Sequence, residues 1–135
     1  MSICRRLLLL LVPMLPALSV AHAQSASPDP CAKAVSQVDM DACYSGEYKK
    51  ADARLNSIYR KALASLQSSK TAVVDLKAAE FAWIKYRDAH CQAAGKQYEG
   101  GSIRPMIESQ CMQLVTQHRI EEIKQAYENG DIKLE

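Results

Sequence analysis

Cys91 is the residue whose neighbours best suit it to act as a nucleophile, because His90 directly precedes it. A histidine beside a cysteine can take the proton from the thiol, and the thiolate is the reactive form. Carboxylate pairs are weaker candidates for catalytic groups, since adjacent residues such as Glu121 and Glu122 point in different directions on a helix. The sequence contains neither the G-x-S-x-G motif of serine hydrolases nor a phosphate-binding loop. Enzymatic chemistry would therefore require Cys91 to be a free thiol.

Whether Cys91 is free depends on the N-terminus, which sets the number of cysteines in the finished protein. Two arginines near the start are followed by an apolar run over residues 7–20, and small residues precede Gln24. This pattern is typical of a cleavable secretory signal peptide, 1–23, with the cut after Ala23. A membrane anchor is the alternative, but the run contains prolines and falls short of the roughly 18 to 20 apolar residues that span a bilayer. We expect export without a membrane anchor.

Cleavage would remove Cys4 and leave an even set of cysteines: Cys31, Cys43, Cys91 and Cys111. An even count in an exported chain favours disulfides over free thiols. Three pairings are possible, and the short spacings favour Cys31 with Cys43 and Cys91 with Cys111. A bridged Cys91 is not a nucleophile, and the sequence lacks closely spaced metal ligands such as C-x-x-C. We expect two disulfides, no metal, no cofactor and no catalytic residue.

A set of polar and aromatic residues, which we call the polar seam, recurs at helical spacing: Asp52, Asn56, Tyr59, Trp83, Arg87, Asp88 and Arg119. A planar guanidinium pairs well with a carboxylate, so Asp52 or Asp88 is expected to meet Arg87 or Arg119. Such pairs usually fix the register between helices. Active sites are usually built around a recognisable acid, base or nucleophile. We therefore favour a structural role for the polar seam.

Three amphipathic helices are expected to carry these residues. Apolar or small residues recur at steps of three and four over about 39–66, about 72–94, and from Pro105 to about 129. No alternating apolar run indicates a sheet. The predicted fold is all-α, with three main antiparallel helices in a small disulfide-stapled bundle.

Local signals predict where the helices begin and end. Asp39 or Asp41 could cap the first helix, and Thr71 could cap the second. Gly95 is expected to stop the second helix, and Pro105 suits the first turn of the third.

The longest connection lies between the second and third helices and contains Gly100 and Gly101. If Cys91 pairs with Cys111, this loop is held on both sides, and a loop already in its bound shape loses less entropy on docking. The alternative is that the glycines only turn the chain. The candidate partner-binding residues in this loop are Lys96, Tyr98, Glu99, Ser102 and Arg104.

These motifs together resemble a known family. The sequence has Ala-Asp-x-x-Leu-Asn at 51–56, then Trp83, Tyr-Arg-Asp at 86–88 and Cys91. The combination resembles the lysozyme inhibitor LprI-like proteins, long catalogued as a domain of unknown function, over nearly the whole mature chain. The founding type is a lipoprotein, whereas this chain has no lipidation cysteine. The resemblance implies a binding protein that inhibits a lysozyme-type muramidase.

Charge and length limit the possible partners and the number of domains. The formal net charge of +2 comes from 17 Lys and Arg against 15 Asp and Glu. Both excess charges lie in the expected signal peptide, so the mature chain is neutral and nothing favours nucleic acid. We expect one helical domain over 31–130 after a flexible segment, 24–30, and before a tail, 131–135.

The expected location is the periplasm or the exterior, and the expected partner is a protein such as a lysozyme. The alternative function is a periplasmic interaction or immunity-type protein that protects the cell envelope without enzymatic activity. The sequence indicates no particular oligomeric state.

Overall fold

The protein is described by a computed structural model over residues 29–127. Its helices are α1 (Gln37–Ser65), α2 (Lys70–Lys96) and α3 (Arg104–Tyr127), and no strand occurs in this range. The all-α bundle expected from the sequence is confirmed. None of these helices is long and apolar enough to cross a membrane. The expected signal peptide, its cut after Ala23 and the tail 131–135 lie outside the described residues.

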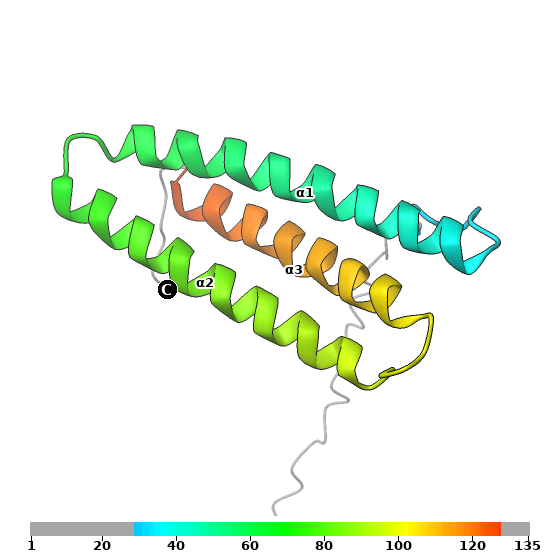
Figure 1. Cartoon of the computed structure of the whole chain (residues 1–135). Helices are drawn as coiled ribbons and strands as arrows, with labels where there is room; N and C mark the ends of the chain where they lie inside the picture. Colours follow the sequence, from blue (N-terminus) through cyan, green and yellow to red (C-terminus); the bar gives the residue numbers. More distant parts are fainter. Residues whose placement is uncertain (1–28, 128–135) are drawn as a thin grey trace, which may run out of the picture.

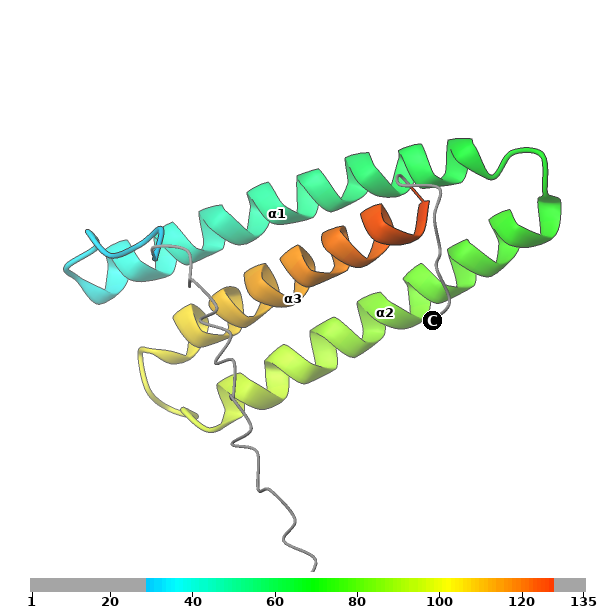
Figure 2. The same ribbon diagram turned by 180° about the vertical axis from the view of Figure 1, so that it is seen from behind.

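The last of the three helices occupies the middle of the bundle. Successive helices run antiparallel, and α3 lies between α1 and α2 in both views (Figures 1 and 2). The backbones of α1 and α2 approach each other only marginally, whereas each packs along α3. Amphipathic patterns predict one buried face for each helix, but α3 has to bury two sides.

The apolar core lies toward the turn that joins α1 to α2. Its five buried members come from all three helices: Leu55, Ala62, Leu76, Ile120 and Ile123. Aromatic side chains from each helix, Tyr59, Trp83 and Tyr127, pack around them. The two disulfides lie nearer the other end of the bundle, where α1 begins and α2 ends. Toward that end Cys91–Cys111 joins α2 to α3, whereas Cys31–Cys43 joins α1 to the segment that precedes it.

Serines cap the first two helices, so the expected caps at Asp39 or Asp41 and at Thr71 are wrong. The Ser36 hydroxyl accepts a hydrogen bond from the Asp39 amide at 3.1 Å and donates one to the Asp39 carboxylate at 2.6 Å. At the start of α2, the Ser69 hydroxyl accepts from the Ala72 amide at 3.3 Å. The serines satisfy amides that a helix leaves unpaired.

Gly95 does not stop α2, which continues through it to Lys96. The residue is buried, and a Cβ added there would clash with the side chain of Glu108 on α3. The glycine thus serves close packing between two helices. The left-handed turn is made by Gly100, whose φ is +80°.

Candidate functional site

Arg87 is the centre of the polar seam and joins α1 to α2. Its side chain is only 8% exposed, and its Nη1 donates to Oδ1 of Asp52 at 3.1 Å. On the other side its Nε and Nη2 both lie 2.9 Å from Oδ1 of Asp88. The meeting of an aspartate with Arg87 expected from spacing therefore occurs twice. One buried cation is shared by two carboxylates, so the three groups together keep one formal negative charge.

Aromatic rings cover the faces of this guanidinium. The Arg87 Cζ lies 5.4 Å from the ring centre of Tyr48 and 5.2 Å from that of Trp83. Burial acts to lower the pKa of Arg87, but the hydrogen bond and charge of Asp88, with Tyr48 and Asp52, outweigh it and raise the pKa. Arg87 is therefore a permanent cation and does not act as an acid or a base.

Arg119 forms a second ion pair, with a residue that the sequence analysis missed. Its Nε and Nη2 both lie 3.1 Å from Oε2 of Glu80, and its Nη1 lies 3.0 Å from Oε2 of Glu122. Its Cζ lies 5.7 Å from the ring centre of Trp83, so this one indole contacts both arginines. The spacing could have indicated Glu80, which lies three residues before Trp83 and seven before Arg87 on the same helix face.

The remaining two members of the polar seam lie beside these pairs. The Asn56 side chain donates to the Asp52 carbonyl at 2.9 Å and to its carboxylate at 3.1 Å, which holds Asp52 toward Arg87. Tyr59 packs at the edge of the apolar core. Burial, with the nearby charge of Glu80, raises the pKa of Tyr59. All seven residues of the polar seam therefore lie in or beside two ion-pair clusters.

The loop after α2 is held by a disulfide and by its own backbone. Cys91 pairs with Cys111, and Cys31 with Cys43, which is the pairing that the spacings favour. Inside the loop, the Tyr98 amide donates to the Gly95 carbonyl at 2.9 Å. The Gly101 amide donates to the Tyr98 carbonyl at 3.0 Å. The loop is a series of tight turns with a bridge across its base.

The five candidate loop residues differ in their exposure and in the ion pairs that they form. Lys96, Tyr98, Glu99 and Ser102 are exposed. Arg104 is engaged: its Nε lies 2.8 Å from Oε1 of Glu108, and its Nη1 lies 3.8 Å from Oε1 of Glu99. The hydrogen bond and the charge of Glu108 raise the pKa of Arg104. Lys96, rather than Arg104, is the cation that this loop offers to a partner.

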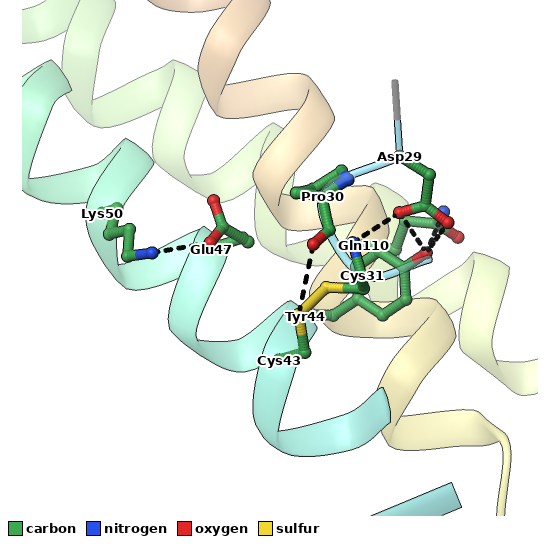
Figure 3. Close-up of a disulfide and its surroundings, with 8 residues drawn as sticks. All are labelled: Asp29, Pro30, Cys31, Cys43, Tyr44, Glu47, Lys50 and Gln110. Carbon is green, nitrogen blue, oxygen red and sulfur yellow. Dashed lines mark hydrogen bonds and ion pairs between the residues drawn. A yellow bond between two sulfur atoms is a disulfide. The ribbon is translucent and has the colours of Figure 1, made fainter. Parts of the chain in front are cut away.

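A third cluster, around the first disulfide, was not predicted. The buried Tyr44 hydroxyl donates to the Asp29 carboxylate, whose two oxygens lie 3.0 Å away, and accepts from Gln110 Nε2 at 3.3 Å (Figure 3). Burial and then Asp29 raise the pKa of Tyr44. Asp29 and Pro30, the two described residues of the segment 24–30, both line a pocket with Tyr44.

The described part of the chain offers little for catalysis. The thiol of the His90 and Cys91 hypothesis is not free, because Cys91 is 0% exposed and bonded to Cys111. No group of three or more His, Cys, Asp or Glu among residues 29–127 could hold a metal ion. The carboxylates nearest the buried arginines are engaged in ion pairs. The arrangement suits binding and structural stability.

Comparison with known proteins decides the family. Residues 29–123, which include the polar seam, both disulfides and the loop, match the family described as lysozyme inhibitor LprI. The chain belongs to the LprI family. An uncharacterised protein of Rhizobium meliloti (strain 1021) is 39% identical over 122 residues, covering 82% of this chain and 87% of the relative. No solved structure matches the chain.

Membership gives the resemblance in the sequence a firm basis. The family is described as lysozyme inhibitor LprI. Asp52, Trp83 and Arg87, on which the resemblance in the sequence rested, link the three helices here.

Proposed function

We propose that this LprI protein is exported to the periplasm or beyond and inhibits a lysozyme-type muramidase as a protein ligand. Membership of the LprI family carries the proposal. Two disulfides support an oxidising compartment, where such bonds persist. The signal peptide expected over 1–23 supports the same location.

The loop between α2 and α3 is the part of the surface that we assign to the muramidase. Lysozymes cleave glycosidic bonds with two carboxyl groups in a cleft. An inhibitor can fill such a cleft with a protruding cation and hydrogen-bonding groups. Lys96 supplies an exposed cation, and Tyr98, which is 43% exposed, supplies a ring and a hydroxyl. The Cys91–Cys111 bond holds the loop before binding, which reduces the entropy lost on docking.

The direct test measures lysis of cell walls by several classes of lysozyme with increasing amounts of the oxidised mature protein. We expect inhibition of at least one class at stoichiometric amounts. The double variant Lys96→Ala/Tyr98→Ala should weaken inhibition by about tenfold or more, as loss of interface anchors does. Tyr86→Ala is the matched control, because Tyr86 is 56% exposed but lies on α2 away from the loop.

Two results would reject parts of this proposal separately. Absence of inhibition of every lysozyme class at high molar excess would reject the muramidase as the target. Inhibition that persists in the Lys96→Ala/Tyr98→Ala protein would reject the loop as the binding surface and keep the target.

A further inference from the structure

A polar pocket lies beside the first disulfide, and neither the polar seam nor the loop uses it. Its volume of about 370 Å³ is large enough for a small molecule. The segment before α1 contributes Asp29 and Pro30 to its lining, and α1 contributes Tyr44 and Glu47. From α3 come Leu114 and three glutamines, spaced so that they share one face of the helix.

One of these glutamines, Gln113, has a buried amide without a partner. The residue is 4% exposed, and its side chain forms no hydrogen bond with another residue of 29–127. Buried amides are normally hydrogen-bonded, through two N–H donors and an acceptor oxygen. In this range only Thr116 has a side-chain polar atom that lacks both a partner and solvent contact. The Gln113 amide is therefore open to the pocket that it lines, and a ligand there would supply its partner.

Asp29 brings an unpaired negative charge to the same pocket. Its carboxylate accepts hydrogen bonds from the Tyr44 hydroxyl, 3.0 Å from both oxygens, and from the Cys31 amide at 2.9 Å (Figure 3). Both donors are neutral. None of the ion pairs formed among residues 29–127 involves Asp29. The charge of this carboxylate is hydrogen-bonded but not compensated.

Among the described residues, every charged member of the lining is acidic. The second acid, Glu47, has its Oε1 2.7 Å from Nζ of Lys50, which is exposed and lies outside the lining. Asp29, Glu47 and Lys50 together keep one formal negative charge. A concave site lined by charges of one sign concentrates ions of the opposite sign. The pocket therefore favours a cation over an anion.

The other groups of the pocket narrow the kind of cation. Pro30 and Leu114 supply apolar surface, and a cation on an aliphatic stem buries that stem along such surface. A guanidinium presents five N–H donors in a plane and matches a carboxylate with two of them. The carboxylate of Asp29 and the amide oxygen of Gln113 are acceptors of the required kind. An ammonium has fewer donors and no planar match to a carboxylate.

We propose that this pocket binds a guanidinium group on a short aliphatic stem. Asp29 holds its charge, the amide oxygen of Gln113 accepts one of its N–H groups, and Pro30 and Leu114 contact the stem. The group comes either from a free small molecule or from an arginine side chain of a partner protein. This inference goes beyond the proposed inhibition, which uses the loop.

The test compares butylguanidinium with butylurea, which has nearly the same shape but no charge, on the full oxidised mature protein. Nuclear magnetic resonance follows the side-chain amide signals during each titration. We expect butylguanidinium to shift the Gln113 amide signal to saturation and to bind about tenfold or more tightly than butylurea. Added salt should reduce the difference, because it screens the charge of the pocket.

Three variants locate the binding site. Asp29→Asn keeps the size of the side chain and should weaken butylguanidinium binding by about tenfold or more, through loss of the charge. Asp75→Asn is the matched control: Asp75 is an exposed acid on α2 that lies outside the lining, and its loss should leave the affinity unchanged. Gln113→Met keeps the length of the side chain, removes the amide and should also weaken binding. Circular dichroism of each variant checks that the fold is kept.

A tripeptide with arginine between two alanines, blocked at both ends, distinguishes the two sources of the group. Binding about tenfold or more tightly than butylguanidinium would assign the pocket to an arginine of a partner protein. Equal or weaker binding of the tripeptide would assign it to a free guanidinium compound.

Equal affinity for butylguanidinium and butylurea, or an affinity that Asp29→Asn does not change, would overturn the proposal. Binding that occurs only after removal of residues 24–28 would also overturn it, by assigning the pocket to this chain's own N-terminal segment. Asp29→Asn should leave lysozyme inhibition by the loop intact. Failure of this inference is thus distinguishable from failure of the proposed function.

Discussion

At the scale of single residues, the structure depends on buried arginines whose charges are paired with carboxylates on other parts of the bundle. Arg87 pairs with a carboxylate on α1 and another on α2, and its guanidinium lies against Trp83. Removing one partner of a buried ion pair costs far more than the pair itself contributes, because the remaining charge loses its partner.

Replacing Arg87 tests this dependence. Arg87→Met should lower the free energy of unfolding by about 2 kcal/mol, since Asp52 and Asp88 lose their charged hydrogen-bond donor but are exposed enough for water to solvate them. Arg87→Lys should recover only part of that loss, because an ammonium cannot contact two carboxylates and two rings as a planar group does. Urea denaturation followed by circular dichroism measures both. Asp88→Asn is the control: Asp88 is 51% exposed, and its loss should cost at most about 1 kcal/mol. Equal losses for Arg87→Met and Asp88→Asn would contradict this account.

The effect of Gly95→Ala on stability should change sign with the residue at position 108. In the present chain Gly95→Ala should destabilise by about 1 kcal/mol, because the new Cβ displaces Glu108 from its pair with Arg104. In a Glu108→Ala background the same change should stabilise by about 0.5 to 1 kcal/mol, since alanine favours a helix. Thermal unfolding of the four proteins completes the cycle. The same sign in both backgrounds would show that Glu108 does not limit the space at Gly95.

Sequence patterns predicted some of the contacts of these residues and not others. The meeting of an aspartate with an arginine follows from spacing, which left open whether Asp52 or Asp88 would meet Arg87 or Arg119. The pairing of Asp29 with Tyr44 does not, since it joins positions 15 residues apart through a segment without periodicity. Gly95 was interpreted as a helix stop because the local sequence contains no sign of the helix that packs against it.

At the scale of elements, three helices and their approximate limits were predictable from periodicity. The central position of α3 was not, because an amphipathic stripe shows which face is buried and not which neighbour buries it. The N-caps differ from the predicted ones for a related reason. Several polar residues near the start of each helix could accept a hydrogen bond, and backbone geometry selected Ser36 and Ser69.

The two disulfides should have different consequences for these elements. Each closes a loop whose loss costs about 3 kcal/mol in the chain-entropy account. Removing Cys31–Cys43 by Cys31→Ala/Cys43→Ala should free the segment before α1 and leave the packing of the three helices in place. Removing Cys91–Cys111 should also loosen α2 against α3. Amide hydrogen exchange distinguishes them: protection should fall around residues 29–36 in the first variant and along 91–111 in the second. Identical exchange patterns would contradict this division.

At the scale of the whole molecule, three tyrosines should make stability depend on alkaline pH. Burial, as the largest cause, raises the pKa of Tyr44, Tyr48 and Tyr59 above the ordinary 10.0. Above pH 10 the unfolded chain therefore loses phenolic protons that the folded chain keeps, and the free energy of unfolding falls as the pH rises through the folded-state pKa values. The stability contributed by these groups is fully present below pH 10.

Denaturation at a series of pH values checks this dependence. The free energy of unfolding should be nearly constant from about pH 8 to 9.5 and should then fall steeply. Tyr44→Phe should make the fall shallower, because one of the three raised groups is gone. It should also lower stability at neutral pH by about 1 kcal/mol, through loss of the hydrogen bonds to Asp29 and Gln110. A fall of unchanged steepness would show that Tyr44 does not contribute to it.

The central place of α3 also bears on the order in which the protein folds. Because α1 and α2 rely on α3 for most of their packing, a growing chain that has only reached residue 96 has no complete core to collapse around. Ile120 and Ile123 arrive late in synthesis and complete that core. Premature folding is thereby delayed until the last helix is made. For a chain proposed to be exported, this order of the helices favours an unfolded polypeptide until α3 has been made.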